Sequence, residues 1–233
     1  MRASNHAARL AAVCGLLAVL LYLVSLPIAH FSDVPKSSDS AAAVAAFFGA
    51  HRSGVLVAFL MNGIAWGVLM PVFLAGLRAL LPGVDDESNF LSLVMWGTGL
   101  IVVGLVLVTI LLLGVLAFRA PSLDPRDARS FYDAFAICGN LSAAPTVAFL
   151  LAFAGLVRRV GGLPAWTVWV AVGSAIAHAL AFASVARTGV FRPTDLFSVL
   201  APLTFQVFLV SVSVALLRGR AASSPAAPSP AAI

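Results

Sequence analysis

The residue with the widest chemical repertoire in this sequence is His178, which stands inside the apolar stretch SAIAHALAF at residues 174–182. A buried imidazole can relay protons, ligate a metal, hold a ligand or hydrogen-bond to a neighbouring helix. Haem or zinc would need further ligands at the same depth, and a proton relay would need a carboxylate within one or two helical turns. The other polar residues therefore decide which chemistry is open to His178.

The apolar segments lack the further histidine or carboxylate partners that metal, haem or proton chemistry would need at the depth of His178. The other histidines are expected near the ends of these segments: His6, His30 and His51. The nearest carboxylate, Asp133, is expected about 7 to 10 Å above the level of His178. The sequence also contains no HExxH, CxxC or glycine-rich phosphate loop. We therefore expect no metal and no cofactor, and an enzyme is disfavoured.

Uncharged polar residues recur in the apolar segments at one depth. Besides His178 they are Asn62, Thr109, Asn140 and Gln206. At a rise of about 1.5 Å per residue, all five lie about 12 to 17 Å below the loops of one side. On that side, three polar residues stand above the layer and mark the mouth of an expected cavity: His30, Tyr132 and Asp133. The layer predicts either ligand contacts in this cavity or hydrogen bonds between helices.

His178 itself is expected to be neutral and to hydrogen-bond across to another helix. Its expected partner is one of three amide side chains in the layer: Asn62, Asn140 or Gln206. Finding such a bond would favour the helix-to-helix interpretation, which is the more ordinary use of a polar residue in lipid.

The elements that must position these residues are membrane-spanning helices. Of the 233 residues, 61% are hydrophobic and only 10% are charged, which is more apolar surface than a water-soluble core buries. Each span is a helix, because backbone amides in lipid must be satisfied within their own segment. Six spans are expected, at residues 10–29, 54–81, 91–118, 131–157, 165–186 and 196–217. The fold class is therefore all-α, a polytopic six-helix transmembrane bundle in one domain over residues 1–220, followed by a disordered tail at 221–233.

The loops carry further helical signals. Four side chains in the first outer loop fall at i, i+3, i+4 and i+7 and predict a short amphipathic helix there: Val44, Phe47, Phe48 and His51. The expected caps are Ser38 or Asp39 for this helix, Asp124 for a helix that continues into the fourth span, the acidic run at 85–87 for the third span, and Thr194 or Asp195 for the sixth.

The basic residues indicate orientation and surroundings. With both termini inside, seven basic residues fall on each side, but the inside set lies against helix ends as RR and RGR, which favours cytoplasmic N and C termini. The formal charge of +5 then meets lipid headgroups and not nucleic acid. Thirteen of the fourteen basic residues are Arg. Because Arg and Ala have GC-rich codons, we expect a high-GC bacterium and its plasma membrane.

Four stretches carry a resemblance that covers nearly the whole chain: AAVAAFFGAHRSGVLVAF, FLAGLRALL, LDPRDARSFYDAF and GGLPAWTVWVAVG. In their order they resemble an uncharacterised family of six-span bacterial membrane proteins, a domain of unknown function common in actinobacteria and firmicutes. The resemblance implies the topology and the bacterial origin. It transfers no catalytic residue.

Two functions remain open at this point. The first is a non-enzymatic membrane protein that holds or passes a small hydrophobic or amphipathic ligand, lipids included, through an outward-facing polar cavity between the second, fourth, fifth and sixth spans. The alternative is a structural or accessory subunit whose surface recognises another membrane protein, as small-residue faces and the amphipathic outer segment suggest. An enzyme ranks third.

Overall fold

The structure is a computed structural model that describes residues 2–186, 190–194 and 196–218. Over this part of the chain all regular elements are helices and no strand occurs. The elements are α1 (Arg2–Ile28), η1 (Phe31–Asp33), α2 (Ala41–Ala50), α3 (Arg52–Ile64), η2 (Ala65–Leu69), α4 (Met70–Leu80), α5 (Asp86–Arg119), η3 (Ala120–Ser122), α6 (Pro125–Leu141), α7 (Ala143–Val160), α8 (Trp166–Phe182) and α9 (Leu196–Arg218).

Five helical segments are long and apolar enough to cross a membrane: His6–Ile28, Arg52–Leu80, Asp86–Ser122, Pro125–Val160 and Leu196–Arg218. The all-α prediction is thereby confirmed, together with five of the expected spans. The remaining span was expected at 165–186, but α8 has only 17 residues and ends at Phe182. The chain turns there because the Ser184 amide bonds back to Ala181 and the side chain of Asn140 holds the Ser184 carbonyl.

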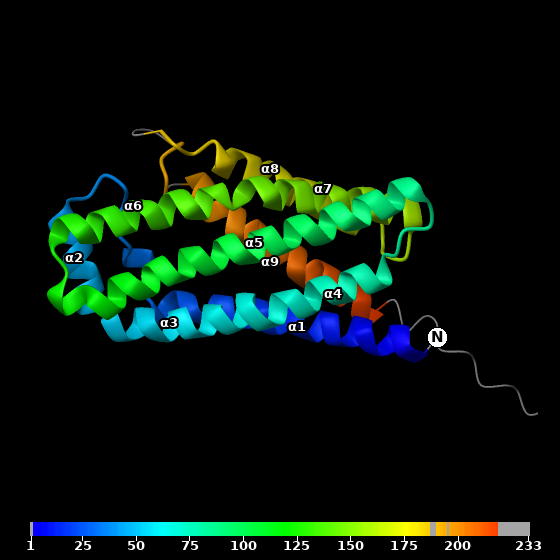
Figure 1. The fold of residues 1–233 in the computed structure, drawn as a ribbon, viewed down its shortest axis with the longest axis horizontal. Coiled ribbons are helices and arrows are strands. Elements are labelled where there is room, and N and C mark those ends of the chain that lie inside the picture. Colours follow the sequence, from blue (N-terminus) through cyan, green and yellow to red (C-terminus); the bar gives the residue numbers. More distant parts are fainter. Residues whose placement is uncertain (1, 187–189, 195, 219–233) are drawn as a thin grey trace, which may run out of the picture.

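The long helices lie side by side along one axis (Figure 1). The start of α1, the end of α4, the junction of α7 with α8 and the end of α9 lie at one end of the bundle, which we call the base. The end of α1, the start of α3, α2 and the start of α6 lie at the other end, which we call the mouth end. Many large apolar side chains on the outer faces are exposed, Leu60 and Trp169 among them, as lipid-facing surfaces require.

Two of the long helical segments are interrupted at mid-length. Between α3 and α4 the chain makes one π-helical turn, in which the Met70 amide bonds to the Ala65 carbonyl, just before Pro71. Between α6 and α7 the helix turns at Ser142, three residues before Pro145. A proline has no N–H for the carbonyl four residues earlier and its ring crowds that carbonyl, so both breaks have a local cause.

The buried apolar side chains form two main clusters. The base cluster extends over α1, η2, α4, α5, α7, α8 and α9, with Phe73, Leu74, Phe149, Phe153 and Phe208 among its fully buried members. The mouth cluster joins α2 to α3, α5 and α6 and consists of Ala29, Val44, Phe47, Phe48, Val55, Ala58, Leu116, Ala117, Ala128 and Tyr132. At the mouth end α3 approaches α1 so closely that a Cβ on Gly54 would lie 2.0 Å from the Ile28 carbonyl oxygen.

The loop signals are largely confirmed, with two corrections. The short helix expected in this loop is α2, which buries Val44, Phe47 and Phe48, but it is apolar on all faces and His51 follows its last residue. Its cap is Ser40, whose hydroxyl accepts the Ala43 amide, and not Ser38 or Asp39. Asp39 is engaged instead in a turn with the Lys36 amide.

The other two described caps follow the prediction. Asp124 caps α6 by accepting the Arg126 amide. Asp85 caps α5 in a reciprocal capping box with Ser88, and Arg159 reaches over from α7 to contact both Asp85 and Glu87. The bond from the Ser88 amide, followed by those from the Ser88 hydroxyl and Arg159, lowers the pKa of Asp85 to about 2. The alternative cap Asp195 and the tail at 221–233 lie outside the described residues.

Candidate ligand-binding cavity

A cavity of about 520 Å³ lies between the two clusters. Its wall takes Trp66, Val102, Ile110 and Phe205 from the base cluster, and Phe47, Phe48, Val55, Ala58 and Tyr132 from the mouth cluster. The volume falls within the range of about 300 to 1,000 Å³ that is typical of small-molecule pockets. The two helix breaks adjoin wall residues in the sequence: Trp66 lies within the π-helical turn before Pro71, and Asn140 lies two residues before Ser142.

The five residues of the polar layer all line this cavity: Asn62, Thr109, Asn140, His178 and Gln206. They come from α3, α5, α6, α8 and α9, so five separate helices each contribute one of them. Of the three residues expected at the mouth, Tyr132 belongs to the wall. His30 and Asp133 are not among the wall residues of the described chain.

The two asparagines use their amide groups to join elements of the wall. Asn62 Nδ2 donates to Ser25 Oγ of α1 at 2.8 Å and to the Ala58 carbonyl of its own helix at 2.9 Å. Asn140 Nδ2 donates to the Ser184 carbonyl beyond the end of α8 at 2.7 Å. These contacts hold α3 to α1 and α6 to the α8 terminus, so both asparagines have a packing role.

His178 does not bond to any of the three amides that the sequence predicted. Its Nδ1 lies 2.8 Å from the Ser174 carbonyl, one turn earlier in α8. The expected cross-helix bond is made by Ser174, whose hydroxyl donates to Thr204 Oγ1 of α9 at 3.3 Å. The prediction of an amide partner for His178 is therefore wrong. A backbone carbonyl of its own helix lies within hydrogen-bond distance of the ring, and the contact between α8 and α9 is made by the hydroxyls of Ser174 and Thr204.

Gln206 and Ser198 line the cavity from positions two turns apart on α9, and their side-chain oxygens make no hydrogen bond within the described chain. Gln206 is 6% exposed, and neither Gln206 Oε1 nor Ser198 Oγ has a hydrogen-bond partner among the described residues. Thr109, in contrast, donates to the Leu105 carbonyl of its own helix at 2.9 Å. A buried polar atom without a partner carries a free-energy penalty of about 1–3 kcal/mol, so these two side chains call for an explanation.

The apolar part of the wall includes a flat aromatic surface. The rings of Trp66 and Phe205 stack with centroids 5.8 Å apart and an interplanar angle of 18°. The edge of the His178 ring meets Phe205 at 5.9 Å, and Phe149 and Phe208 pack behind it. Sequence reasoning missed Trp66 and Phe205, because an aromatic residue in an apolar segment looks the same whether it lines a cavity or fills a core.

At the mouth end the cavity is covered by the loop at residues 31–40, which we call the cover loop. Five of its residues line the cavity: Phe31, Ser32, Val34, Pro35 and Lys36. Lys36 is the one residue with a formal charge in the described part of the wall. The cover loop therefore forms the part of the cavity wall that faces the mouth end.

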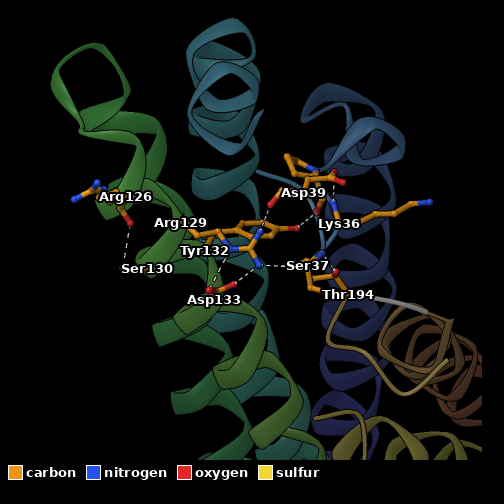
Figure 2. Close-up of polar contacts among 10 residues, drawn as sticks. Lys36, Ser37, Asp39, Arg126, Arg129, Ser130, Tyr132, Asp133 and Thr194 are labelled. Carbon is orange, nitrogen blue, oxygen red and sulfur yellow. Dashed lines mark hydrogen bonds and ion pairs between the residues drawn. The ribbon is translucent and has the colours of Figure 1, made fainter. Parts of the chain in front are cut away.

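Two side chains of α6 hold the cover loop in place (Figure 2). The guanidinium of Arg129 donates to the carbonyls of Ser37 and Asp39, at 2.7 Å for Asp39, and is itself fixed by an ion pair with Asp133 at 2.9 Å. Tyr132, which is fully buried, donates its hydroxyl to the Pro35 carbonyl. Asp133 thus acts at the mouth by orienting Arg129, although it does not reach the cavity.

A third contact ties the cover loop to the segment before α9. The Ser37 amide donates to Thr194 Oγ1 at 3.2 Å, and Thr194 adopts a left-handed backbone conformation with φ of 70°. Arg129 and Thr194 were not among the predicted site residues. The i, i+4 spacing of Arg129 and Asp133 is visible in the sequence, but it predicts only a helix-surface ion pair and not its contact with a loop 90 residues away.

The described residues were also compared with the requirements of a metal site. Among the described residues, no group of three or more His, Cys, Asp or Glu side chains is placed to hold a metal ion. The two cysteines, Cys14 and Cys138, are free. Comparison with known protein families, curated proteins and solved structures finds no match to this chain. The function must therefore be argued from the cavity itself.

Proposed function

We propose that this protein holds, or passes, a small hydrophobic or amphipathic ligand in the cavity between its two clusters. The observation that carries the proposal is an apolar cavity of about 520 Å³ at mid-bundle whose wall includes the unpartnered oxygens of Gln206 and Ser198. A packed helix interface would have no reason to keep such a space open, because voids cost contact energy. A bound amphiphile would fill the volume and supply the missing hydrogen-bond partners.

The proposal includes six membrane crossings, with α8 as the short one. Both α7 and α9 run from the middle or mouth end toward the base, so the chain must return along α8 between them (Figure 1). At about 1.5 Å per residue, its 17 residues extend over about 26 Å, slightly less than the hydrocarbon core of about 30 Å. Trp166 and Trp169 are exposed at the base end of α8, where an interfacial aromatic belt would place them.

We further propose the plasma membrane of a bacterium, with the base on the cytoplasmic side. The base carries Arg78, Arg158, Arg159 and Arg218 close to helix ends. The resemblance to the uncharacterised six-span bacterial family supports the same source and topology. The cavity and its cover loop then lie in the outer half of the membrane, and the ligand is held on that side.

The test is photolabelling of the protein in phosphatidylcholine nanodiscs with a twelve-carbon alkyl alcohol that carries a diazirine in its chain. Labelled residues, mapped by mass spectrometry, should include cavity-lining positions such as Val106 and Phe205. In a Val106→Trp variant the larger side chain occupies part of the cavity, and this labelling should decrease. Val108→Trp is the matched control, because Val108 lies two residues further along α5 on an exposed face.

Labelling confined to exposed outer residues in the wild-type protein would contradict the proposal. So would cavity labelling that is undiminished in the Val106→Trp variant, provided that its thermal unfolding matches that of the Val108→Trp control. Both substitutions are in α5, so a general effect of a tryptophan on this helix would appear in both variants.

One observation favours the alternative of an accessory subunit. A Cβ added to Gly63, Gly97 or Gly104 would meet no heavy atom within 4 Å, so small residues are left open on the outer surface of α3 and α5. In lipid, such faces allow another helix to approach closely. This function would require a stable complex with a second membrane protein, which crosslinking in native membranes followed by purification would detect, and substitution of Gly104 by Leu should abolish it.

A further inference from the structure

Several hydrogen-bond donors in the cavity wall are already used within the protein. Both hydrogens of the Asn62 amide are engaged, by Ser25 Oγ and by the Ala58 carbonyl. The hydroxyls of Thr109 and Thr146 donate to carbonyls of their own helices. Tyr132 donates to the cover loop. The Ser198 hydroxyl, which has no partner among the described residues, can still donate to a ligand.

Acceptor atoms of the wall are open as well. Because the Ser174 carbonyl can only accept, the hydrogen of a neutral His178 ring must be on Nδ1, which leaves Nε2 as an acceptor on a cavity-lining residue. Gln206 Oε1 and Ser198 Oγ are buried without partners in the described chain. Pro202, also in the wall, has no N–H for the Ser198 carbonyl, so a further acceptor lacks its helical donor.

The wall also selects against a charged head group. Its polar layer contains only neutral side chains, and Lys36 sits in the cover loop above them. A carboxylate or an ammonium group at the level of Gln206 would be desolvated without a counter-charge, which is strongly unfavourable. The head group that fits is neutral and carries at least one O–H.

The wall reaches the lipid-facing surface between α1 and α9. Three of its residues are substantially exposed there or at the adjoining cover loop: Phe31 at 39%, Val199 at 47% and Leu203 at 39%. Toward the base, α1 and α9 are tightly joined, since a Cβ on Gly15 would lie 2.4 Å from Ser213 Oγ. An alkyl chain can therefore extend from the polar layer toward the outer leaflet, while the base end is closed.

From these contacts we infer that the ligand is a neutral lipid-like alcohol, whose hydroxyl donates to the acceptors of His178 and Gln206 while its chain lies along the aromatic and apolar wall. This inference rests on the proposed function and adds the head-group chemistry to it. The hydroxyl, being both donor and acceptor, also suits the amide of Gln206 and the hydroxyl of Ser198.

The experiment is competition against the diazirine alcohol in nanodiscs by compounds that share one chain and differ in the head group: dodecanol, its methyl ether, dodecanoate and dodecylammonium. Dodecanol should compete about tenfold better than the ether, the equivalent of one net buried hydrogen bond. The two charged compounds should be weaker still. Butanol, which has the hydroxyl without the long chain, should not compete at matched membrane concentration if the ligand comes from the bilayer.

Variants of α9 supply the controls. Gln206→Leu should reduce the tenfold preference for the alcohol over the ether to less than threefold without loss of the fold, because Gln206 Oε1 has no described partner to lose. Ser213→Ala is the matched control: Ser213 Oγ is likewise buried and unpartnered but lies outside the cavity wall, so the preference should stay tenfold.

The outcomes separate this inference from the proposed function. Cavity labelling that competes equally with alcohol, ether and carboxylate would overturn the head-group inference and leave the binding function standing. Absence of cavity labelling would overturn both. A preference that persists in Gln206→Leu and is lost in Ser213→Ala would contradict the assignment of the head group to the Gln206 side of the cavity.

Discussion

Replacing Arg129 by Ala should release the cover loop from the mouth of the cavity. The guanidinium makes two hydrogen bonds to loop carbonyls, those of Ser37 and Asp39. Hydrogen bonds to a charged group contribute about 1.5–3 kcal/mol each when buried. The Arg129 side chain is 22% exposed, and water can replace part of both bonds, so we take roughly 2–3 kcal/mol for the pair. Since about 1.4 kcal/mol corresponds to a factor of ten, the opening equilibrium of the loop should rise about 30- to 150-fold.

Amide hydrogen exchange measured by mass spectrometry reports this opening directly. The amides of Lys36, Ser37 and Asp39 are hydrogen-bonded in the closed loop, to Asp39 Oδ2, Thr194 Oγ1 and the Lys36 carbonyl respectively. Where loop closing is faster than chemical exchange, their protection should fall by the same factor as the opening equilibrium rises. Protection of amides within α7 should stay unchanged, because the loop makes no hydrogen bond to that helix.

Arg126→Ala is the matched control for this experiment. Arg126 lies one turn earlier in α6, and its side chain points away from the cover loop (Figure 2). Equal loss of protection in both variants would mean that the net charge of α6, and not the Arg129 contacts, holds the loop. Unchanged protection in Arg129→Ala would refute the reasoning, since the two bonds would then contribute nothing to loop closure.

Three further predictions concern stability, each measured by thermal or denaturant unfolding in detergent. The pKa of Asp85 is about 2 in the fold against 3.8 unperturbed, so the stabilisation from its charged cap is present above about pH 4 and is lost between about pH 4 and pH 2. The difference in unfolding free energy between wild type and Asp85→Ala should therefore close over that interval. Gly54→Ala should destabilise by about 3 kcal/mol because its Cβ would lie 2.0 Å from a backbone oxygen, whereas Gly49→Ala, with open space around it, should be neutral or stabilising; equal effects would refute the close approach. Asn140→Leu should cost about 1–3 kcal/mol by leaving the Ser184 carbonyl unpaired, and an unchanged midpoint would mean that water replaces the amide.

The sequence was sufficient for the all-helical class and for five of the expected membrane-spanning segments, and it gave an expected depth for the polar residues. Apolar length determines where a helix crosses lipid, and a constant rise per residue converts position into depth, so five side chains from five helices could be placed at one level. Whether that level is packed or hollow depends on how the helices are displaced sideways, which a depth calculation does not contain. The cavity itself was therefore only one of two open interpretations.

Hydrogen-bond partners were harder to predict than positions. The sequence placed His178 among three amides and predicted a bond to one of them, but a backbone carbonyl one turn away was within reach of the ring. Arg129 is a comparable case, because its contact with the cover loop depends on tertiary structure. In both cases differences of a few ångströms decide which of several chemically suitable partners is bonded, and residue types and spacing do not reveal such distances.

The separation of the base cluster from the mouth cluster by the cavity has a consequence for cooperativity. The two clusters have no buried residue in common, and two of the helical segments between them are broken, at the π-turn before Pro71 and at Ser142, whereas α5 runs unbroken through both. Segments joined by weak mechanical links unfold at different free energies. The mouth cluster, with fewer buried residues, is then the less stable folding unit. It can loosen while the base stays folded, so a ligand bound as proposed would exchange by partial unfolding of the mouth end without a rigid-body hinge.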